Sequence, residues 1–350
     1  MIEMAGSKGI NSINETPLKL PNLEFSGETL NALVRRVSDK DTLIVTDPFN
    51  YPKIGDTGLS VAVVRNNDSL QIPELISSCA YTRVVAVGGC AALDIGRACA
   101  VGRSIIVIPT ILSTSCISLD RSVIRYSGVN RLEKTILPEK VIISLPDLLS
   151  MPPAELAKWC QSGFGDLFTM VAASIDLQYK AGDLSREAVL GNIRDCGGAL
   201  EWVINLFDGY NESSVRALAE FLHESSLVVV KRDNSNLNAA GEHLLYHALL
   251  RLYPHYTSAR PTHGQIVAAG TLIATAIYSE QTGDNYIFDM ISEAFGKLGL
   301  PLTYAELSAA GIERSHLIEG LSAILRLGSH LGDHFKNNGF RILDRIFDRR

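Results

Sequence analysis

The stretch that decides the fold begins as an apolar strand and turns into a helix at two glycines: Val84-Val85-Ala86-Val87-Gly88-Gly89-Cys90-Ala91-Ala92-Leu93-Asp94. A strand that ends in glycine at the start of a helix presents unpaired backbone N–H groups and the positive end of the helix dipole. Glycine matters here because a Cβ would block the close approach of a phosphate group to the backbone. We therefore predict a nucleotide-binding turn at Gly88 and Gly89, with a plain tight turn as the alternative.

The segments around this stretch alternate between short β-branched runs and helical patterns. This alternation predicts a parallel sheet whose two faces are covered by helices. The predicted strands are Thr42–Thr46, Leu59–Val64, Arg83–Val87, Ser104–Ile108 and Val141–Ser144, and the predicted helices between them include Gly27–Val37 and Ala91–Val101.

The second half of the chain differs from the first. After Pro152-Pro153, helical periodicity continues to the C-terminus, and Pro153 stands where the first residue of a helix is expected. A chain of 350 residues is long enough for two domains. We predict an α/β, Rossmann-like dinucleotide-binding domain with a parallel sheet over residues 1–149, and an all-helical metal-binding and substrate domain over residues 150–350.

Composition excludes several classes of protein. Hydrophobic residues make up 46% and charged residues 20%, and the net charge is −6, so we expect no nucleic-acid partner. The apolar runs are too short for membrane insertion, and Met1–Asn14 lacks the apolar core of a signal peptide. The six cysteines show no C-x-x-C spacing, which favours free thiols in a reducing compartment. We therefore expect a cytoplasmic protein.

Three stretches farther along the chain carry potential metal ligands: Gly163-Phe164-Gly165-Asp166, Gly241-Glu242-His243-Leu244-Leu245-Tyr246-His247 and Thr262-His263-Gly264-Gln265. One carboxylate and two imidazoles can hold Zn²⁺ and leave a fourth position open for a substrate oxygen, as in a catalytic site. His243 and His247 lie one helical turn apart on one face. Such a pair is often structural, and one of the two can be a neighbour of the site rather than a ligand.

Other polar residues follow predicted strands, where open α/β sheets bind their ligands. Asp47 comes directly after the first predicted strand, where a carboxylate can accept from a ribose diol, although Asp-Pro is also a common turn. The strand that ends at Ile108 leads into Pro109-Thr110-Ile111-Leu112-Ser113-Thr114-Ser115. The hydroxyl groups of this stretch are expected either to hydrogen-bond a bound nucleotide or to cap the next helix. Asp94, near the start of the helix that follows Gly89, is either a cofactor contact or a carboxylate that only complements the helix dipole.

The order of these motifs resembles the glycerol-1-phosphate dehydrogenase branch of the iron-containing alcohol dehydrogenase and dehydroquinate synthase superfamily. The resemblance covers nearly the whole chain and implies the roles that follow. The metal ligands would be Asp166, His243 and His263, and His247 would be a near-site residue that relays a proton. Gly88, Gly89, Asp94, Thr110 and Ser113 would line the dinucleotide, and Asp47 would contact the adenosine ribose.

The chain departs from the family pattern at three places. Cys90 replaces the usual third glycine and adds a side chain beside the pyrophosphate, and Arg97 replaces a usual lysine. Where the family carries an aspartate near the substrate and nicotinamide, this chain has Ser113-Thr114-Ser115-Cys116, so we place Ser115 at that catalytic position. Basic residues that could contact a phosphate group include Lys134, although charged residues near loops are more often solvated surface.

The resemblance implies an enzyme: an NAD(P)-dependent, metal-containing oxidoreductase that acts on a small polyol or polyol phosphate and assembles as a homo-oligomer. We expect NAD rather than NADP, because Asp47 would repel the 2′-phosphate of NADP. Zinc is the expected metal, and Fe²⁺ suits the same donors. Two alternatives are a sugar-phosphate cyclase like dehydroquinate synthase, which uses NAD transiently, and a family member with altered catalysis.

Overall fold

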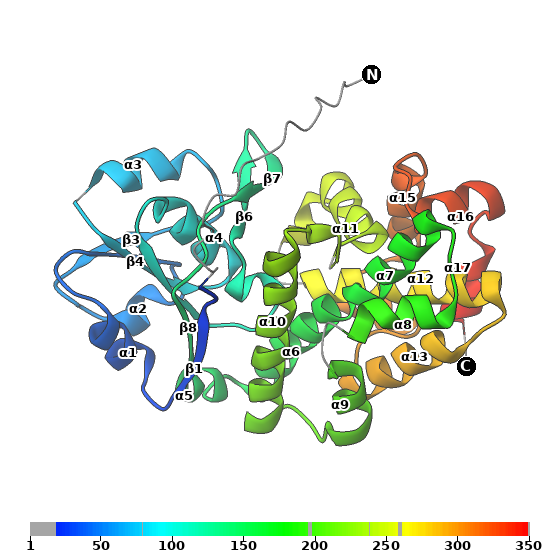
Figure 1. The fold of residues 1–350 in the computed structure, drawn as a ribbon, viewed down its shortest axis with the longest axis horizontal. Coiled ribbons are helices and arrows are strands. Elements are labelled where there is room, and N and C mark those ends of the chain that lie inside the picture. The colour runs from blue at the N-terminus through cyan, green and yellow to red at the C-terminus, as the bar shows by residue number, and fades with distance from the viewer. Residues whose placement is uncertain (1–18, 79, 195–197, 238, 258–260, 349–350) are drawn as a thin grey trace, which may run out of the picture.

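A sheet with its covering helices forms one part of the fold, and a larger set of helices forms the other (Figure 1). This arrangement is seen in a computed structural model that describes residues 19–78, 80–194, 198–237, 239–257 and 261–348. The predictions for Met1–Asn14, Cys79 and Cys196 lie outside the described residues. The other four cysteines are free, as expected.

The main sheet is parallel throughout, as predicted, and its six strands are ordered β1-β8-β5-β4-β2-β3. Their bounds are β1 (Asn22–Ser26), β2 (Thr42–Thr46), β3 (Ser60–Val63), β4 (Arg83–Gly88), β5 (Ser104–Pro109) and β8 (Lys140–Ser144). The sequence predicted the last five but missed β1, so the strand before Asp47 is the second of the chain. It also missed an antiparallel hairpin formed by β6 (Arg121–Tyr126) and β7 (Val129–Lys134).

The central strands of the sheet are buried on both faces, which explains why β2, β4 and β5 are largely apolar. Val85 and Val87 of β4 belong to a core with the helices α1 (Leu30–Val37) and α2 (Tyr51–Ile54). Val84 and Ala86 point the other way, into a core that contains residues of α4 (Cys90–Cys99). The helix α3 (Gln71–Ser78) packs beside α4. Because side chains along β4 point alternately to the two faces of the sheet, the strand contributes to a separate core with the helices on each face.

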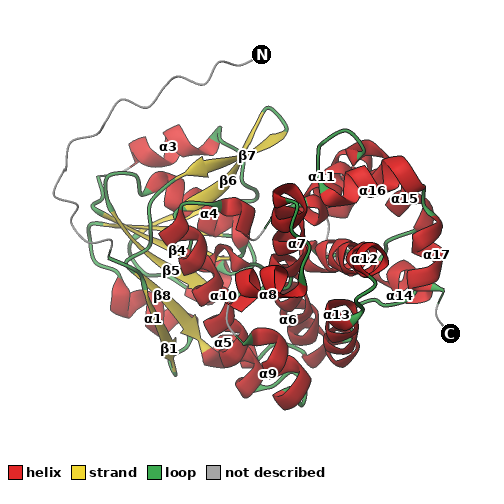
Figure 2. Cartoon of the chain, turned by 45° about the vertical axis from the view of Figure 1, so that its right-hand side comes forward, coloured by secondary structure: helices red, strands yellow, loops and turns green. Residues whose placement is uncertain are grey.

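After β8, every regular element of the described chain is helical (Figure 2). The fold class is therefore confirmed: a parallel α/β part followed by a mostly helical part. The α-helices are α5 (Leu145–Leu149), α6 (Pro153–Leu167), α7 (Thr169–Ala181), α8 (Arg186–Arg194), α9 (Ala199–Leu206), α10 (Glu212–Arg232), α11 (Gly241–Leu252), α12 (His263–Thr282), α13 (Tyr286–Leu298), α14 (Tyr304–Ala310), α15 (Arg314–Ile324), α16 (His330–Asn338) and α17 (Arg341–Phe347). Short 3₁₀ helices are η1 (Ser115–Ser118), η2 (Ser235–Leu237) and η3 (Pro254–Thr257).

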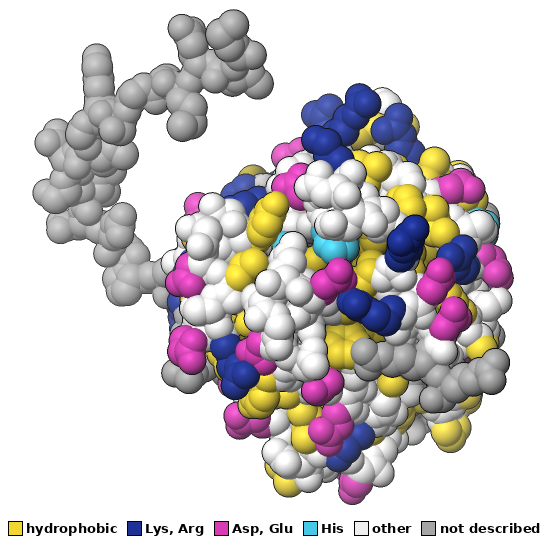
Figure 3. Space-filling model, turned by 90° about the vertical axis from the view of Figure 1, so that its right-hand side faces the viewer, with side chains coloured by type: hydrophobic (Ala, Val, Ile, Leu, Met, Phe, Trp, Pro, Cys, Tyr) yellow, Lys and Arg dark blue, Asp and Glu magenta, His cyan; other side chains and the backbone are white. Residues whose placement is uncertain are grey.

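Buried positions of α12 extend along most of its length, so this helix lies inside the helical part rather than on its surface. It contacts α6, α7, α11 and α13, and it is the helix around which the others are arranged. On the face shown in Figure 3, acidic and basic side chains are interspersed. Among the described helices, none has the length and apolar character needed to cross a membrane.

Candidate metal and dinucleotide site

The first two predicted metal ligands are brought together where α6 and α12 cross. Asp166 is the second-last residue of α6, and His263 is the first residue of α12. The glycines next to them in sequence face each other, because a Cβ on Gly165 would overlap the backbone of Gly264. A Cβ on Gly264 would in turn overlap the carbonyl oxygen of Ser162. Glycine at both positions is therefore what lets the two helices approach closely enough to pair their ligands.

The start of α12 is fixed locally by its own sequence. The Thr262 hydroxyl oxygen accepts a hydrogen bond from the backbone N–H of Gln265 at 3.3 Å. The side-chain oxygen of Gln265 accepts one from the backbone N–H of Thr262 at 3.0 Å. This reciprocal capping box satisfies two N–H groups that the first turn of a helix leaves unpaired. The capping box therefore fixes the first turn of α12, from which the His263 side chain points at Asp166.

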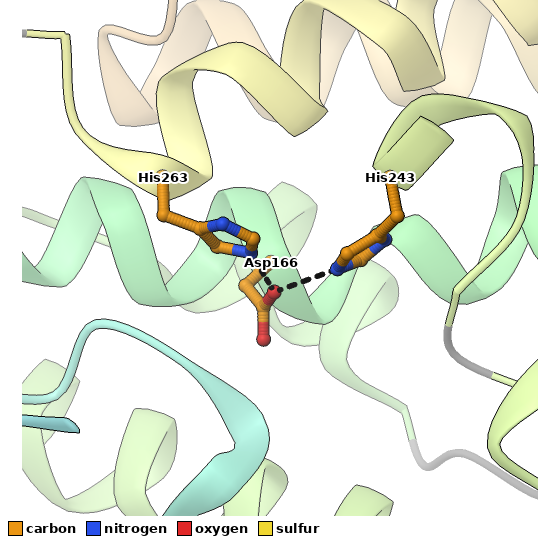
Figure 4. Close-up of side chains that lie close together, drawn as sticks. All are labelled: Asp166, His243 and His263. Atoms are coloured by element: carbon orange, nitrogen blue, oxygen red, sulfur yellow. Dashed lines mark hydrogen bonds and ion pairs between the residues drawn. The ribbon is translucent and has the colours of Figure 1, made fainter. Parts of the chain in front are cut away.

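The third predicted ligand arrives on α11. His243 and His263 point at the carboxylate of Asp166 from different helices (Figure 4). The Asp166 Oδ1 atom lies 2.7 Å from His263 Nε2 and 3.6 Å from His243 Nε2. All three ligand atoms lie within 4.8 Å of one another. Residues separated by nearly a hundred positions thus form one compact donor set of one carboxylate and two imidazoles.

The electrostatics of this cluster suit a cation. Burial by itself would raise the pKa of Asp166, but hydrogen bonds to His243 and His263 outweigh it and lower that pKa well below its usual range. Burial lowers the pKa of His243, but hydrogen bonds to Asp166 and Glu242 outweigh it and raise that pKa to about 9. Positive charge is therefore favoured beside the Asp166 carboxylate. A divalent metal ion would supply that charge in place of the two imidazole protons.

The donor set fits a divalent metal with nitrogen and oxygen ligands. Asp166 is buried, while about a fifth of each histidine side chain remains exposed, 18% for His243 and 20% for His263. The cluster is thus covered on the carboxylate side and accessible on the imidazole side. Three protein ligands with an accessible side are the arrangement of a catalytic zinc site rather than a structural one.

The predicted nucleotide turn lies at the switch point of the sheet, where two neighbouring strands are followed by strands on opposite sides of the pair. The strands β2 and β4 are neighbours, but β2 leads to β3 on one side and β4 leads to β5 on the other. Ligands of open α/β sheets bind at the carboxyl ends of two such strands. Asp47 follows β2, Gly88 ends β4 and Gly89 comes directly after it, so the structure brings these three of the predicted cofactor residues to this point.

The two glycines shape the turn. Gly88 has a φ of +144°, and a Cβ there would overlap the Asp47 carboxylate. Gly89 caps the N-terminus of α4, and its N–H donates to Asp47 Oδ2 at 3.1 Å. Cys90, the first residue of α4, turns its thiol toward the hydroxyls of Ser113 at 3.7 Å and Thr114 at 3.5 Å. The thiol therefore lies between the glycine turn and the loop after β5, residues 110–115, which we call the hydroxyl loop.

A buried asparagine that the sequence analysis did not single out connects these segments. Asn50 donates through Nδ2 to both carboxylate oxygens of Asp47, at 2.9 and 3.0 Å, and to Thr110 Oγ1 at 2.9 Å. Its backbone N–H also donates to Asp47 Oδ1 at 2.9 Å. The ends of β2, β4 and β5 are thus joined in one hydrogen-bond network. A polar residue three positions after Asp47 was the available signal.

The hydroxyl loop after β5 links the dinucleotide turn to the metal cluster. The backbone N–H of Ser115 donates to Asp166 Oδ2 at 2.7 Å, and Ser226 on α10 donates to the Ser115 carbonyl. The Ser113 carbonyl accepts from Ser162 on α6 at 3.2 Å. Ser115 therefore lies beside the cluster, where its backbone N–H contacts Asp166, and its catalytic role remains a prediction.

Asp94 and Lys134 are engaged elsewhere in the protein. Asp94 is buried within α4 beside Arg97, and burial raises the pKa of this carboxyl to about 7. Arg97 is itself fully buried and donates to the carbonyls of Cys116 and Ile117. Lys134 ends the exposed β6–β7 hairpin, where it forms ion pairs with Asp120 at 2.6 Å and Asp233 at 2.9 Å. A cofactor contact for either residue remains a prediction.

His247 lies one turn after His243 on α11, and Tyr246 separates it from His263. The Tyr246 ring packs edge-on against His263, with centroids 4.3 Å apart, and lies 5.3 Å from the His247 ring. His247 is solvent-exposed, yet surrounding protein atoms lower its pKa to about 4. The sequence analysis missed Tyr246, since an aromatic residue at helical spacing usually belongs to the core.

Comparisons with known proteins agree with this picture. No protein-family model matches the chain. A glycerol-1-phosphate dehydrogenase from Thermoplasma acidophilum is 25% identical over 240 residues, 68% of this chain and 64% of that enzyme, so the chain matches less than two thirds of its length.

Solved structures match over nearly the whole chain. A probable glycerol dehydrogenase from Sinorhizobium meliloti has a TM-score of 0.68 and 18% identity, covering 93% of this chain and 98% of that one. An iron-containing alcohol dehydrogenase from Corynebacterium glutamicum has a TM-score of 0.59 and 17% identity, covering 91% of each chain. The predicted resemblance is confirmed: the sequence is similar to glycerol-1-phosphate dehydrogenases, and the fold is that of the iron-containing alcohol dehydrogenases.

Proposed function

We propose that the protein is a metal-dependent, NAD(P)-linked oxidoreductase that acts on a small polyol or polyol phosphate. The observation that carries this proposal is the compact donor set of Asp166, His243 and His263, with ligand atoms within 4.8 Å. It lies one hydrogen bond away from the hydroxyl loop that follows β5. The similarity to glycerol-1-phosphate dehydrogenases supports the choice of substrate class and cofactor.

Asp166, His243 and His263 would hold the metal, which we propose is zinc, with Fe²⁺ as the alternative. A bound divalent metal would polarise the alcohol or carbonyl oxygen of the substrate and lower the pKa of the alcohol. The Ser115 amide fixes Asp166 Oδ2 and leaves Oδ1 directed at the two imidazoles. The chain itself therefore orients its carboxylate ligand.

The dinucleotide would bind at the carboxyl ends of β2, β4 and β5. Its pyrophosphate would lie at the N-terminus of α4, where Gly88 and Gly89 allow close backbone approach, Cys90 lies alongside, and the helix dipole favours negative charge. Thr110 and Ser113 would contact the cofactor from the neighbouring strand end, and Asp47 would accept from the adenosine ribose. The nicotinamide ring supplies the hydride acceptor when the cofactor is bound.

His247 is the proposed proton relay. It lies one turn from His243, and desolvation by the surrounding protein atoms, together with the charges of His243 and His263, lowers its pKa to about 4. The side chain is therefore neutral near pH 7 and able to accept a proton. Tyr246, packed against both His247 and His263, would hold the imidazole at this position.

The proposal extends to the state of the protein in the cell. We propose a homo-oligomer in the cytoplasm. The free thiols of Cys90, Cys99, Cys116 and Cys160 are consistent with a reducing compartment. Light scattering coupled to size-exclusion chromatography measures the number of chains per particle.

Following the absorbance of reduced cofactor tests the function. Protein loaded with Zn²⁺ is mixed with NAD and a panel of free and phosphorylated polyols. The proposal expects net formation of reduced cofactor with at least one polyol, and none with Asp166→Asn. Reduced cofactor that forms only transiently would instead indicate a cyclase. No reduction with any polyol, at full metal occupancy, would contradict the proposal and indicate altered catalysis.

A further inference from the structure

Glu242 combines deep burial with a direct contact to a proposed metal ligand. Its side chain is fully buried in α11, immediately before His243. Its Oε1 atom accepts hydrogen bonds from His243 Nδ1 at 2.8 Å and from the Ala240 amide at 2.7 Å. Within the described residues, its Oε2 atom is buried and has no hydrogen-bond partner. A carboxylate left partly unsatisfied in the interior is destabilising.

The packing around Glu242 is specific to this arrangement. The helix α12 passes directly over it at Gly270, where a Cβ would lie 2.6 Å from Glu242 Cβ and 2.9 Å from Glu242 Cα. Glycine at this position lets α12 pack against the Cα and Cβ atoms of Glu242 without displacing α11. Gly270 and Glu242 therefore act together to place a buried carboxyl group behind His243.

Capping of α11 does not by itself explain the carboxylate. Elsewhere in the chain neutral side chains accept from the backbone N–H at a helix start, Gln265 at the start of α12 and Ser214 at the start of α10. Glu306 does it at the start of α14, but on the surface, where a charge is solvated. A buried charge at residue 242 is thus more than the helix end requires.

We propose that Glu242 is a positioning residue for His243, an inference that rests on the proposed metal site. By accepting from Nδ1–H, Glu242 fixes the tautomer in which His243 Nε2 carries the free lone pair. That nitrogen faces Asp166 Oδ1 at 3.6 Å, on the side where the metal would bind. A carboxylate at this position also raises the basicity of the imidazole, which makes Nε2 a stronger electron-pair donor to a metal, as carboxylates behind metal-binding histidines do.

The test measures the Zn²⁺ dissociation constant by competition with a chromophoric chelator. Glu242→Gln preserves the size of the side chain and removes its charge, and we expect zinc binding about 10- to 100-fold weaker than in the native protein. Glu306→Gln is the matched control, because it makes the same change at a capping glutamate whose carboxylate accepts from Leu302 and Thr303 rather than from a histidine. The control should bind zinc as the native protein does.

The outcomes separate this inference from the proposed function. Native protein that binds no zinc contradicts the proposed function itself. Native affinity in Glu242→Gln, with lowered thermal stability, would show that Glu242 only caps α11 and would overturn the inference alone.

A second measurement needs no variant and therefore does not depend on folding of Glu242→Gln. NMR of histidine labelled with ¹⁵N, in zinc-loaded native protein, reports which ring nitrogen of His243 carries the proton. Protonated Nδ1 with zinc at Nε2 supports the inference, and protonated Nε2 overturns it.

Discussion

We expect the choice between NAD and NADP to depend on Asp47. Its carboxylate accepts from the Gly89 N–H and from Asn50, so its oxygens already shape the turn. A ribose diol would donate to the same carboxylate. Because this carboxylate lies at the end of β2, an added 2′-phosphate of NADP would meet a like charge in a partly covered site.

We therefore expect native protein to bind NAD at least about tenfold more tightly than NADP, a difference of about 1.4 kcal/mol. Asp47→Gly should reduce this preference, mainly by improving NADP binding. Dissociation constants of both cofactors, measured for both proteins by quenching of intrinsic fluorescence, check this. If Asp47 only shapes the turn, native protein will bind the two cofactors equally and the substitution will weaken both.

The residues that sequence reasoning missed share one property. Asn50 contacts Thr110, sixty positions away, and Glu242 is covered by Gly270 on another helix. Neither contact leaves a pattern in the local sequence. Asp166, His243 and His263 could be named in advance because their motifs match a family, whereas their distances to one another come from helix packing.

At the scale of elements, the buried central strands were predictable from the sequence, as was β3 at one edge of the sheet. β2, β4 and β5 are continuous β-branched runs, and their predicted bounds differ from the observed ones by no more than one residue. β1 lies at the edge of the sheet and is only partly buried, and the β6–β7 hairpin carries charged residues on its exposed side. Strands of this kind lack the apolar pattern that predicts burial.

The crossing of α6 and α12 is the element contact that assembles the metal cluster. Gly264→Ala places a methyl group against the Ser162 carbonyl, so the helices must separate. We expect a loss of about 2 kcal/mol or more in the free energy of unfolding, and weaker zinc binding, since Asp166 and His263 move apart. Urea denaturation and zinc stoichiometry measure the two effects.

Gly191→Ala is the matched control for this substitution. Gly191 lies within α8 with no atom within 4 Å of an added Cβ. Alanine there should leave stability unchanged or raise it by about 0.5–1 kcal/mol. Equal zinc affinity and equal stability in Gly264→Ala and native protein would contradict the role given to this crossing.

For the molecule as a whole, stability should depend on pH through a histidine remote from the cluster. His330 begins α16, is buried, and has its pKa lowered by that burial to about 4, from an ordinary value of 6.5. The unfolded chain therefore binds a proton more readily than the folded protein does. The contribution of His330 is fully present above pH 6.5 and is lost as the pH falls toward 4, by about 3 kcal/mol at most.

Replacing His330 with Gln should remove this part of the pH dependence. Urea midpoints measured between pH 7 and pH 4 for native protein and variant give the difference. The native protein should lose more stability on acidification than the variant. Parallel curves would show that His330 is not protonated on unfolding in this range. His334 and His223, whose pKa values are also lowered by burial, remain in both proteins and cancel in the comparison.

The central claim is that one divalent metal per chain is held by Asp166, His243 and His263. The most direct measurement is zinc content by elemental analysis, after loading and removal of free metal, in native protein and in His263→Ala. Because the His263 side chain is 20% exposed at the start of its helix, the variant should keep the native circular dichroism spectrum. We predict one zinc per native chain and none in the variant. Full occupancy in folded His263→Ala, or no zinc in the native protein, would contradict the account.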